Sequence, residues 1–257
     1  MNSKVRYETE GAVATVTITR PEVRNCVDGE TAQGLAGAFR RFEADETLRV
    51  AILTGEDGAF CAGADLKAVS SMQDPPKLKP GGDGPLGCSH MQLSKPVIAA
   101  VEGHAVAGGL ELAIWCDLRV AATDATFGVY CRRFGVPLVD GGTIRLARLI
   151  GQSHALDMIL TGRGVGGEEA LRMGLANRLV DPGTTLAVAR ELAGQLAEFP
   201  QRCMLADRDS CYRQWGLDVD EALRRELEGG LEVIRSGETR EGATRFASGQ
   251  GRHGRFS

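Results

Sequence analysis

The sequence lacks the features of membrane, secreted and nucleic-acid-binding proteins. No apolar run approaches the roughly 20 residues that a membrane-spanning helix needs. The opening residues MNSKVRYE lack the apolar core of a secretory signal peptide. The formal net charge of −4 at pH 7 gives no electrostatic reason to expect nucleic acid or an anionic membrane as a partner. We therefore expect a cytoplasmic protein that binds neither.

Paired cysteines and clustered metal ligands are also missing. The seven cysteines are an odd number and include no C-x-x-C pair, which argues against a disulfide framework and against a zinc ribbon. His90 and His104 form no metal-binding pattern with each other or with a nearby cysteine. We predict no metal site, and a reducing cytoplasm is the simplest compartment.

What remains is the composition and patterning of an ordinary globular α/β protein. The 257 residues can build one core with a small appended domain, and the 34 glycines indicate many tight turns. β-Branched and apolar runs predict strands within 5–20, with a turn at Glu10-Gly11, and at 50–55, 97–101 and 118–122. Helical spacing predicts helices at 31–45, 89–94, 143–149, 155–160, 187–199, 202–215, 219–235 and 239–247.

The stretch from Pro96 to Asp117, PVIAAVEGHAVAGGLELAIWCD, carries the chemistry. It reads as a buried strand, a glycine turn that uses conformations closed to other residues, and a helix from Leu110. Gly108 and Gly109 would lie just before that helix, so backbone N–H groups point into a cleft at the positive end of its dipole. Glu111 places a carboxylate beside them. This combination can polarise a carbonyl and move a proton next to it.

A second block, Val50 to Lys67, reads VAILTGEDGAFCAGADLK and predicts a strand followed by a turn of small residues into a helix. Small side chains let a ligand approach the backbone closely. The two blocks, in this order and at this separation, resemble the crotonase (enoyl-CoA hydratase/isomerase) superfamily. The resemblance extends from about Val5 to about Phe246.

The resemblance implies a fold and an assembly. Residues 1–195 would form a ClpP-like spiral of ββα turns that holds an acyl-CoA site, and 196–257 a C-terminal helical region for trimerisation. The expected assembly is a homotrimer or a hexamer made of two trimers.

The resemblance also implies roles for residues. The N–H groups of Ala64 and Gly108 would form an oxyanion hole, and Glu111 would transfer protons. No metal or redox cofactor is implied, because CoA enters as part of the acyl-CoA thioester substrate. Arg24 either approaches a CoA phosphate or is a solvated loop residue. In the tail, either Arg252 or Arg255 contacts the CoA phosphates or the C-terminus is frayed. The residues expected to line the CoA site are Arg24, Ala62, Ala64, Asp65, Leu66, Gly108 and Gly109.

The sequence departs from the hydratase pattern at Cys131. A standard enoyl-CoA hydratase has its second catalytic glutamate at this position, four residues before the glycine matched by Gly135. A thiol, with an ordinary pKa of about 8.5 against about 4.3 for glutamate, is not a chemical substitute, so we expect Cys131 to be buried and inert. Asp140 is either the second acid/base group, as in the dienoyl-CoA isomerase branch, or the N-cap of a helix from Gly142. Arg132 and Arg133 either pair with Asp140 or Glu111 or face solvent.

The segment from Met72 to Gly87 is dense in proline and glycine, which predicts a mobile loop rather than a packed element. It would either cover the acyl end of the site or lie on the surface without a role. The function expected is that of an enoyl-CoA hydratase. The alternatives are an enoyl-CoA or dienoyl-CoA isomerase that uses Glu111 and Asp140, and a non-catalytic acyl-CoA binder. A dinucleotide-binding fold is excluded, since no G-x-G-x-x-G follows a strand and opens a helix.

Overall fold

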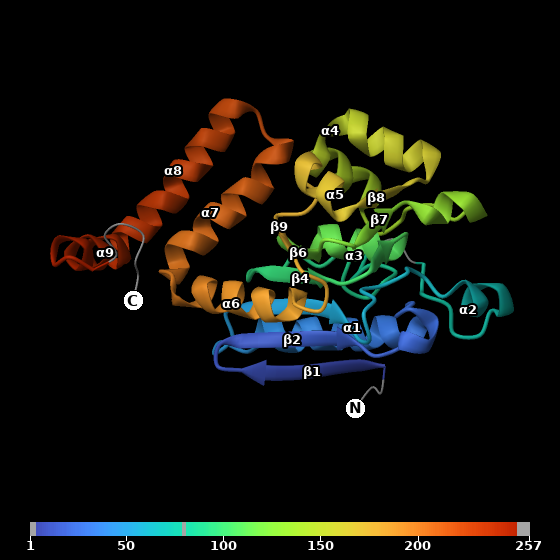
Figure 1. The fold of residues 1–257 in the computed structure, drawn as a ribbon. Coiled ribbons are helices and arrows are strands. Elements are labelled where there is room, and N and C mark those ends of the chain that lie inside the picture. Colours follow the sequence, from blue (N-terminus) through green and yellow to red (C-terminus); the bar gives the residue numbers. More distant parts are fainter. Residues whose placement is uncertain (1–3, 79–80, 251–257) are drawn as a thin grey trace. The chain divides into compact units, whose positions relative to one another are not determined.

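The computed structural model describes residues 4–78 and 81–250 (Figure 1). Two compact units divide the chain, the first ending at Leu196 and the second beginning at Ala197. Arg252 and Arg255, for which a contact with CoA phosphates and a frayed terminus were the two alternatives, lie outside the described residues. No helix of the described part is long and apolar enough to cross a membrane.

A six-stranded sheet forms the frame of the first unit, in the order β1-β2-β3-β4-β6-β9. All its neighbouring strands are parallel except the β1–β2 hairpin at one edge. The four central strands are almost entirely buried, as expected for parallel strands covered on both faces. The strands are β1 (Val5–Glu10), β2 (Val13–Ile18), β3 (Val50–Gly55), β4 (Val97–Val101), β6 (Leu118–Ala122) and β9 (Arg178–Val180).

A second, three-stranded sheet consists of β5 (His104–Val106), β7 (Thr126–Gly128) and β8 (Gly164–Gly166). The chain passes from a strand of the large sheet to a strand of the small one and then to a helix, and repeats this order. An isolated bridge between Cys61 and Ala105 places the first block beside β5 in the same way. The result is the expected spiral of ββα turns. The short strands escaped sequence analysis because three residues show no periodicity.

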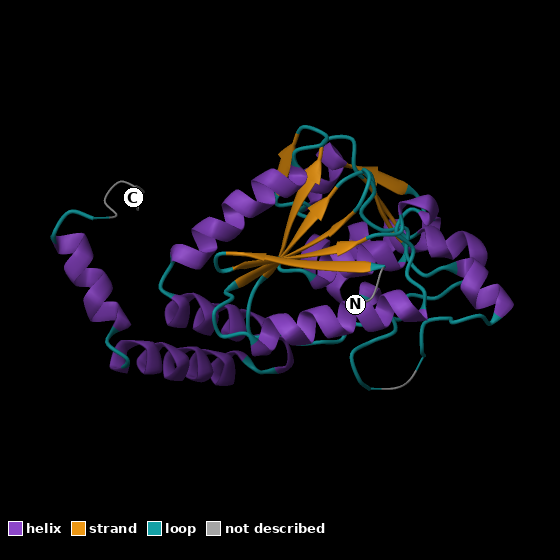
Figure 2. Ribbon diagram, turned by 90° about the horizontal axis from the view of Figure 1, so that it is seen from below, coloured by secondary structure: helices purple, strands orange, loops and turns teal. Residues whose placement is uncertain are grey.

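Helices cover the large sheet, as Figure 2 shows. α1 (Gly29–Ala44) and α3 (Gly108–Trp115) lie on the same face, where the rings of Phe39 and Trp115 meet edge to face with centroids 4.8 Å apart. This pair joins α3 to the main core. The remaining helices that begin in the first unit are η1 (Pro21–Val23), α2 (Leu66–Ser71), η2 (Tyr130–Phe134), α4 (Gly142–Thr161), α5 (Gly167–Met173) and α6 (Thr185–Glu198).

The second unit is helical, as predicted for this part of the chain. α8 packs against both α7 and α9. The carboxylate of Asp218 accepts the N–H of Glu221 at 2.9 Å and caps α8. The elements are α7 (Gln201–Arg213), η3 (Gln214–Gly216), α8 (Val219–Arg235) and α9 (Glu238–Ala247).

Three predictions of local structure need correction. The helix expected at 89–94 is absent, because the buried side chain of Ser89 is bound elsewhere and the segment runs as turns into β4. The helices expected at 143–149 and 155–160 both belong to α4, which is kinked at Gly151 with φ +77°. The irregular segment 72–87 is not unpacked throughout, since Leu86 at its end is 1% exposed.

Candidate active site

The two sequence blocks meet at the N-terminus of α3. A Cβ atom on Gly109 would lie 1.9 Å from the carbonyl oxygen of Cys61, so only glycine permits this approach. The N–H of Cys61 donates to the carbonyl of His104 at 2.9 Å, and the N–H of Val106 donates to the carbonyl of Cys61 at 3.1 Å. Main-chain hydrogen bonds therefore hold the first block against the second.

Two backbone nitrogens, those of Ala64 and Gly108, lie close to each other at this junction. A Cβ on Gly63 would lie 2.7 Å from the nitrogen of Gly108, and a Cβ on Gly108 would lie 3.5 Å from the nitrogen of Ala64. The N–H groups of Ala64 and Gly108 have no acceptor among the described residues. Gly108 is the first residue of α3, where the helix dipole adds positive potential. The pair has the form of an oxyanion hole.

The backbone at this turn differs from the expectation in one respect. α3 begins at Gly108 rather than Leu110, and the left-handed residue is Ala107, with φ +54°, rather than Gly108 or Gly109. The N–H of Ala107 donates to the carbonyl of Gly128 at 2.8 Å, which anchors the strained residue. Gly108 and Gly109 are needed for close packing, and only Gly103, with φ +52°, provides the predicted conformational freedom.

Glu111 is 2% exposed and lies in the first turn of α3. Its Oε1 accepts the N–H of Asp140 at 2.9 Å and the N–H of Gly142 at 2.8 Å. Burial raises the pKa of Glu111 to about 7, with a further contribution from the charge of Asp140 and opposition from the two N–H donors. A carboxyl group with such a pKa can both accept and donate a proton near neutral pH.

Asp140 is 3% exposed, and its side chain does not cap α4. The N-cap residue is Gly141, with φ +93°, so the capping hypothesis is wrong. Instead, Oδ1 of Asp140 accepts the N–H of Leu86 at 3.0 Å and the hydroxyl of Ser89. Burial raises the pKa of Asp140, although both donors lower it.

One oxygen of each carboxyl group remains available. Neither Oε2 of Glu111 nor Oδ2 of Asp140 has a donor among the described residues. Neither oxygen is among the fully buried polar atoms that lack a hydrogen-bond partner, so both keep some exposure to solvent. Each carboxyl group is thus anchored by one oxygen and can present the other to a ligand.

Cys131 is 6% exposed, as predicted. Burial and the nearby carboxyl group of Glu111 raise the pKa of its thiol, so it has little thiolate at neutral pH. Arg132 and Arg133 are exposed and bind the carbonyls of Ile159 and Gly162, not the carboxyl groups.

The arginine beside the carboxyl groups is Arg145, which sequence analysis missed. Its guanidinium binds the carbonyl oxygens of Asp140 and Ser89, both at 2.8 Å. Its position one helical turn after Gly141 was a usable signal. Leu86 and Ser89 gave no signal, because they lie more than 50 residues from Asp140 in the sequence.

Comparison with known proteins identifies the family. Residues 8–251 match the family model described as enoyl-CoA hydratase/isomerase. The chain belongs to this family. It is 36% identical over 253 residues to a carnitinyl-CoA dehydratase from Salmonella arizonae, with 96% of each chain covered. It is 35% identical over 244 residues to enoyl-CoA hydratase EchA19 from Mycobacterium tuberculosis, with 93% of this chain and 92% of the relative covered.

The fold agrees with this assignment. The crystal structure of enoyl-CoA hydratase EchA1 from Mycobacterium marinum superposes with a TM-score of 0.89 at 35% identity, covering 95% of this chain and 96% of the other. The predicted crotonase-type α/β fold is therefore confirmed. Relatives named as hydratases and dehydratases are hydro-lyases, and enzymes of the family generally work without a cofactor. Among the described residues, no group of three or more His, Cys, Asp or Glu side chains could hold a metal ion.

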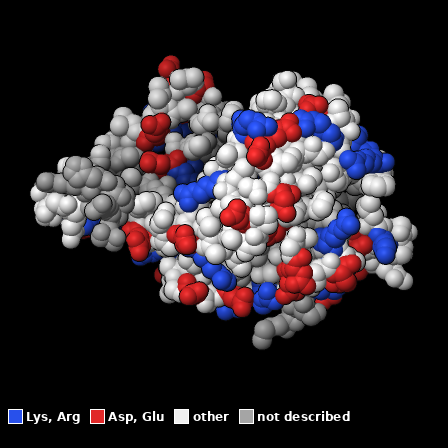
Figure 3. Space-filling model, in the orientation of Figure 1, with Lys and Arg blue, Asp and Glu red and all other residues white. Residues whose placement is uncertain are grey.

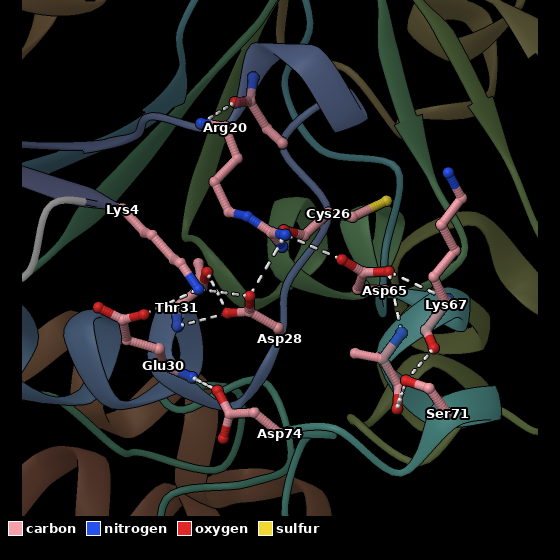
Figure 4. Close-up of polar contacts among 12 residues, drawn as sticks. Lys4, Arg20, Cys26, Asp28, Glu30, Thr31, Asp65, Lys67, Ser71 and Asp74 are labelled. Atoms are coloured by element: carbon pink, nitrogen blue, oxygen red, sulfur yellow. Dashed lines mark hydrogen bonds and ion pairs between the residues drawn. The ribbon is translucent and has the colours of Figure 1, made fainter.

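In this crotonase-type fold Arg20 binds Asp65, the residue after Ala64, and Figure 4 shows its guanidinium between Asp28 and Asp65. Its guanidinium, with a side chain 11% exposed, lies 2.9 Å from Asp65 and 3.3 Å from Asp28, and it binds the carbonyl of Cys26 at 2.6 Å. Burial acts to raise the pKa of Asp65, but the bond and charge of Arg20 and the N–H groups of Lys67 and Ala68 together outweigh it, and the pKa is lowered. Asp28 and Asp65 are also the N-caps of α1 and α2.

Of the residues predicted to line a CoA site, Asp65 and Gly109 are engaged in contacts within the protein, whereas Arg24 and Leu66 are exposed. Asp65 is occupied within the protein, since Oδ1 accepts N–H groups at the start of α2 and Oδ2 binds Arg20. Gly109 is buried against Cys61. Arg24 and Leu66 are exposed, and the N–H of Ala62 donates to the carbonyl of Arg24 at 3.0 Å, which brings these predicted residues together beside Ala64.

Proposed function

We propose that the chain is a hydro-lyase that adds water reversibly across the 2,3 double bond of an enoyl-CoA thioester. The thioester oxygen would accept the N–H groups of Ala64 and Gly108. As water adds to C3, electron density moves to this oxygen, and fixed donors stabilise the enolate. Loss of one such donor typically lowers the rate by ~10²–10³.

Glu111 and Asp140 would handle the protons. One carboxylate takes a proton from the attacking water as the oxygen bonds to C3, and a carboxylic acid delivers a proton to C2 as the enolate collapses. Because the pKa of Glu111 is about 7, this group can fill either role, and Asp140 fills the other. Each would act through the oxygen that its anchoring bonds leave available.

The observation that carries this proposal is the position of Asp140. Its N–H holds Glu111 at 2.9 Å, which supplies a second carboxyl group beside the first although Cys131 replaces the usual glutamate. The test follows crotonyl-CoA hydration by the enoyl-thioester absorbance in the wild type, Glu111→Gln and Asp140→Asn. Loss of turnover in both variants, with crotonyl-CoA still bound, is the expected result. Wild-type turnover in either variant would remove that residue from the mechanism.

Isomerisation is a second candidate, favoured by Cys131 and Asp140 together. Moving a double bond needs a base that reaches two carbons and needs no bound water. A wild-type protein that binds crotonyl-CoA without hydrating it, but shifts the double bond of a 3-enoyl-CoA or a dienoyl-CoA, would establish this activity instead. Binding without turnover on all three substrates would indicate a non-catalytic acyl-CoA binder.

For CoA itself, the proposed contacts are the backbone and small side chains at Ala62 and Ala64, the apolar side chain of Leu66, and Arg24 for a phosphate. The exposed positions of Arg24 and Leu66 support this. Arg24→Ala is expected to raise KM for crotonyl-CoA without changing kcat. An unchanged KM would show that Arg24 is a solvated loop residue that does not bind CoA.

Self-association is proposed through α8. Four of its large apolar side chains are more than half exposed and follow helical spacing: Val219, Leu223, Leu227 and Ile234. Such a stripe is stable in water when a partner surface covers it. A trimer or a hexamer is expected by light scattering, and Leu223→Glu with Leu227→Glu should shift the mass toward the monomer.

The setting proposed is the cytoplasm, with the acyl-CoA as the only small-molecule partner and no added metal or redox cofactor. All seven cysteines are free, which suits a reducing compartment. On the face drawn in Figure 3, acidic and basic side chains are interspersed, which supports the absence of a nucleic-acid surface there. Turnover is expected to survive dialysis against EDTA, and its loss would reveal a metal requirement.

A further inference from the structure

Ser89 is a buried polar residue that no element of the proposed chemistry has yet used. Its side chain is 0% exposed, and its hydroxyl donates to Oδ1 of Asp140. The N–H of Leu86 donates to the same oxygen at 3.0 Å. Both donors thus act on one oxygen, and Oδ2 is left without a donor among the described residues.

The hydroxyl has little freedom to move. A Cβ on Gly84 would lie 2.1 Å from Oγ of Ser89 and 2.8 Å from the nitrogen of His90, so the backbone closes over the side chain. The N–H of His90 donates to the carbonyl of Asp83 at 2.9 Å and closes this turn. The position of Oγ is therefore set by the turn rather than by rotation in solvent.

Arg145 ties this turn to the residue that Ser89 holds. One guanidinium nitrogen binds the carbonyl of Ser89 and another binds the carbonyl of Asp140, both at 2.8 Å. The hydroxyl and the carboxyl group are thus attached to two main-chain segments that share one clamp. Arg145 thereby holds the main chain of Ser89 and Asp140 in register, and the bond from the hydroxyl acts on the carboxyl group itself.

Several titratable groups surround Asp140, and the hydroxyl of Ser89 donates a hydrogen bond to its carboxyl group among them. His90 from the turn and Arg145 from α4 act to lower the pKa of Asp140, and the charge of Asp140 in turn acts to raise the pKa values of Glu111, Cys61 and Cys88. Because the proposed proton transfer uses Oδ2, Oδ1 remains an acceptor in both protonation states of Asp140, and the hydroxyl of Ser89 can donate to it in either state.

We propose that Ser89 is a positioning residue of the acid/base pair: its hydroxyl holds Oδ1 of Asp140 and so directs Oδ2 toward the substrate. This inference rests on the proposed function, in which Asp140 transfers a proton. Ser89 does not touch the substrate. Its effect on turnover passes entirely through Asp140.

A double-mutant cycle in the full chain tests this, with crotonyl-CoA as the substrate. Ser89→Ala is expected to lower kcat by about 10- to 100-fold, the usual effect of losing a hydrogen bond to a charged group. KM should change by less than about twofold, since binding of CoA is not involved. The limb of the pH profile of kcat that reports Asp140 should move to higher pH, because the carboxylate loses a donor. Ser94→Ala, an exposed serine of the same segment, should match the wild type.

The decisive comparison is made in the Asp140→Asn background. There Ser89→Ala should lower the remaining rate by less than about twofold, since residues that act as one unit are not additive. An equal loss in both backgrounds would make Ser89 a merely structural residue and overturn the inference. Ser89→Cys replaces the hydroxyl by a larger, weakly donating thiol and serves if Ser89→Ala fails to fold. Its pH profile should shift in the same direction, and an unshifted profile would again overturn the inference.

The two levels of the proposal fail differently. If Asp140→Asn turns over like the wild type, Asp140 has no catalytic role and the proposed function fails, together with the inference. If Asp140→Asn is impaired and Ser89→Ala is not, the proposed function survives and the inference alone is wrong.

Discussion

The backbone N–H of Asp140 donates to Oε1 of Glu111 at 2.9 Å, so the main chain of one carboxyl-bearing residue fixes the side chain of the other. Asp140 thus has two distinct parts: a backbone N–H that binds Glu111 and a carboxyl group that does not. The amide of Asp140 orients Glu111, and the carboxyl group of Asp140 is the one proposed above to transfer a proton. We therefore expect Asp140→Asn to remove that proton transfer without removing the orienting bond.

Stability is expected to depend on pH through Glu111. The folded state keeps its proton up to a pKa of about 7, whereas the unfolded chain releases it near ~4.3. Folding therefore takes up a proton between these values, and stability falls as the pH rises through this window. In Glu111→Gln this loss is absent, so the variant should gain on the order of 3 kcal/mol relative to the wild type between pH 5 and pH 8. Urea unfolding at fixed protein concentration measures the difference, and a constant gap would contradict the raised pKa.

The glycine at position 142 should be required for activity. A Cβ there would lie 2.8 Å from Oε1 and 2.9 Å from Cγ of Glu111, so Gly142→Ala must displace the carboxyl group. Misplacement by about 1 Å can cost ~10² in rate, and kcat should fall by that order. The matched control is Gly37→Ala in the middle of α1, where nothing lies within 4 Å. It should keep full activity and gain about 0.5–1 kcal/mol in stability. Equal activity in both variants would show that Glu111 adapts.

Cys131→Ala is expected to be nearly neutral in turnover. The thiol is buried and its pKa is raised, so it is neither a base nor a nucleophile near neutral pH. The hydration rate of crotonyl-CoA should stay within about threefold of the wild type, the small change reflecting lost packing beside Glu111. A collapse in rate without a loss of folded protein would mean that the thiol participates.

Arg20→Met should loosen the oxyanion loop and destabilise the fold. Removing one partner of a buried ion pair typically costs about 3–5 kcal/mol, because the remaining charge is unpaired, and Asp65 would be left in that state. We expect a loss near the lower end of this range, since Asp28 keeps its bond to Lys4. The comparison is Arg6→Met, whose ion pairs are more exposed and worth at most about 1 kcal/mol. Similar losses in the two variants would argue against a special role for Arg20.

Much of the site was predictable because its main parts are local in the sequence. The β3 and β4 runs, the glycines before and within α3, and Glu111 in its first turn all follow from patterns of a few residues. The departure at Cys131 and the candidacy of Asp140 were also visible. What the sequence could not show are contacts between distant segments, such as Ser89 with Asp140 and Arg20 with Asp65.

The errors have the same origin. A helix was predicted at 89–94 from local spacing, but the tertiary contacts of Ser89 and the binding of Lys95 to three carbonyls at the end of α1 hold this segment in turns. Asp140 has the residue type of an N-cap, but a buried pair of donors competes for its carboxylate and Gly141 takes the capping position.

The contact between Gly109 and Cys61, and the bridge between Cys61 and Ala105, have a consequence for how such a protein can change. The N–H groups of Ala64 and Gly108, the proposed oxyanion donors, belong to segments that cannot shift separately, since a shift in one backbone moves the other. Exchange of a single loop with a relative should therefore give an inactive chimera, whereas exchange of 61–65 together with 105–111 should transfer a working hole. We therefore expect segments 61–65 and 105–111 to change together in evolution. Differences in substrate preference are then expected in the segments around them.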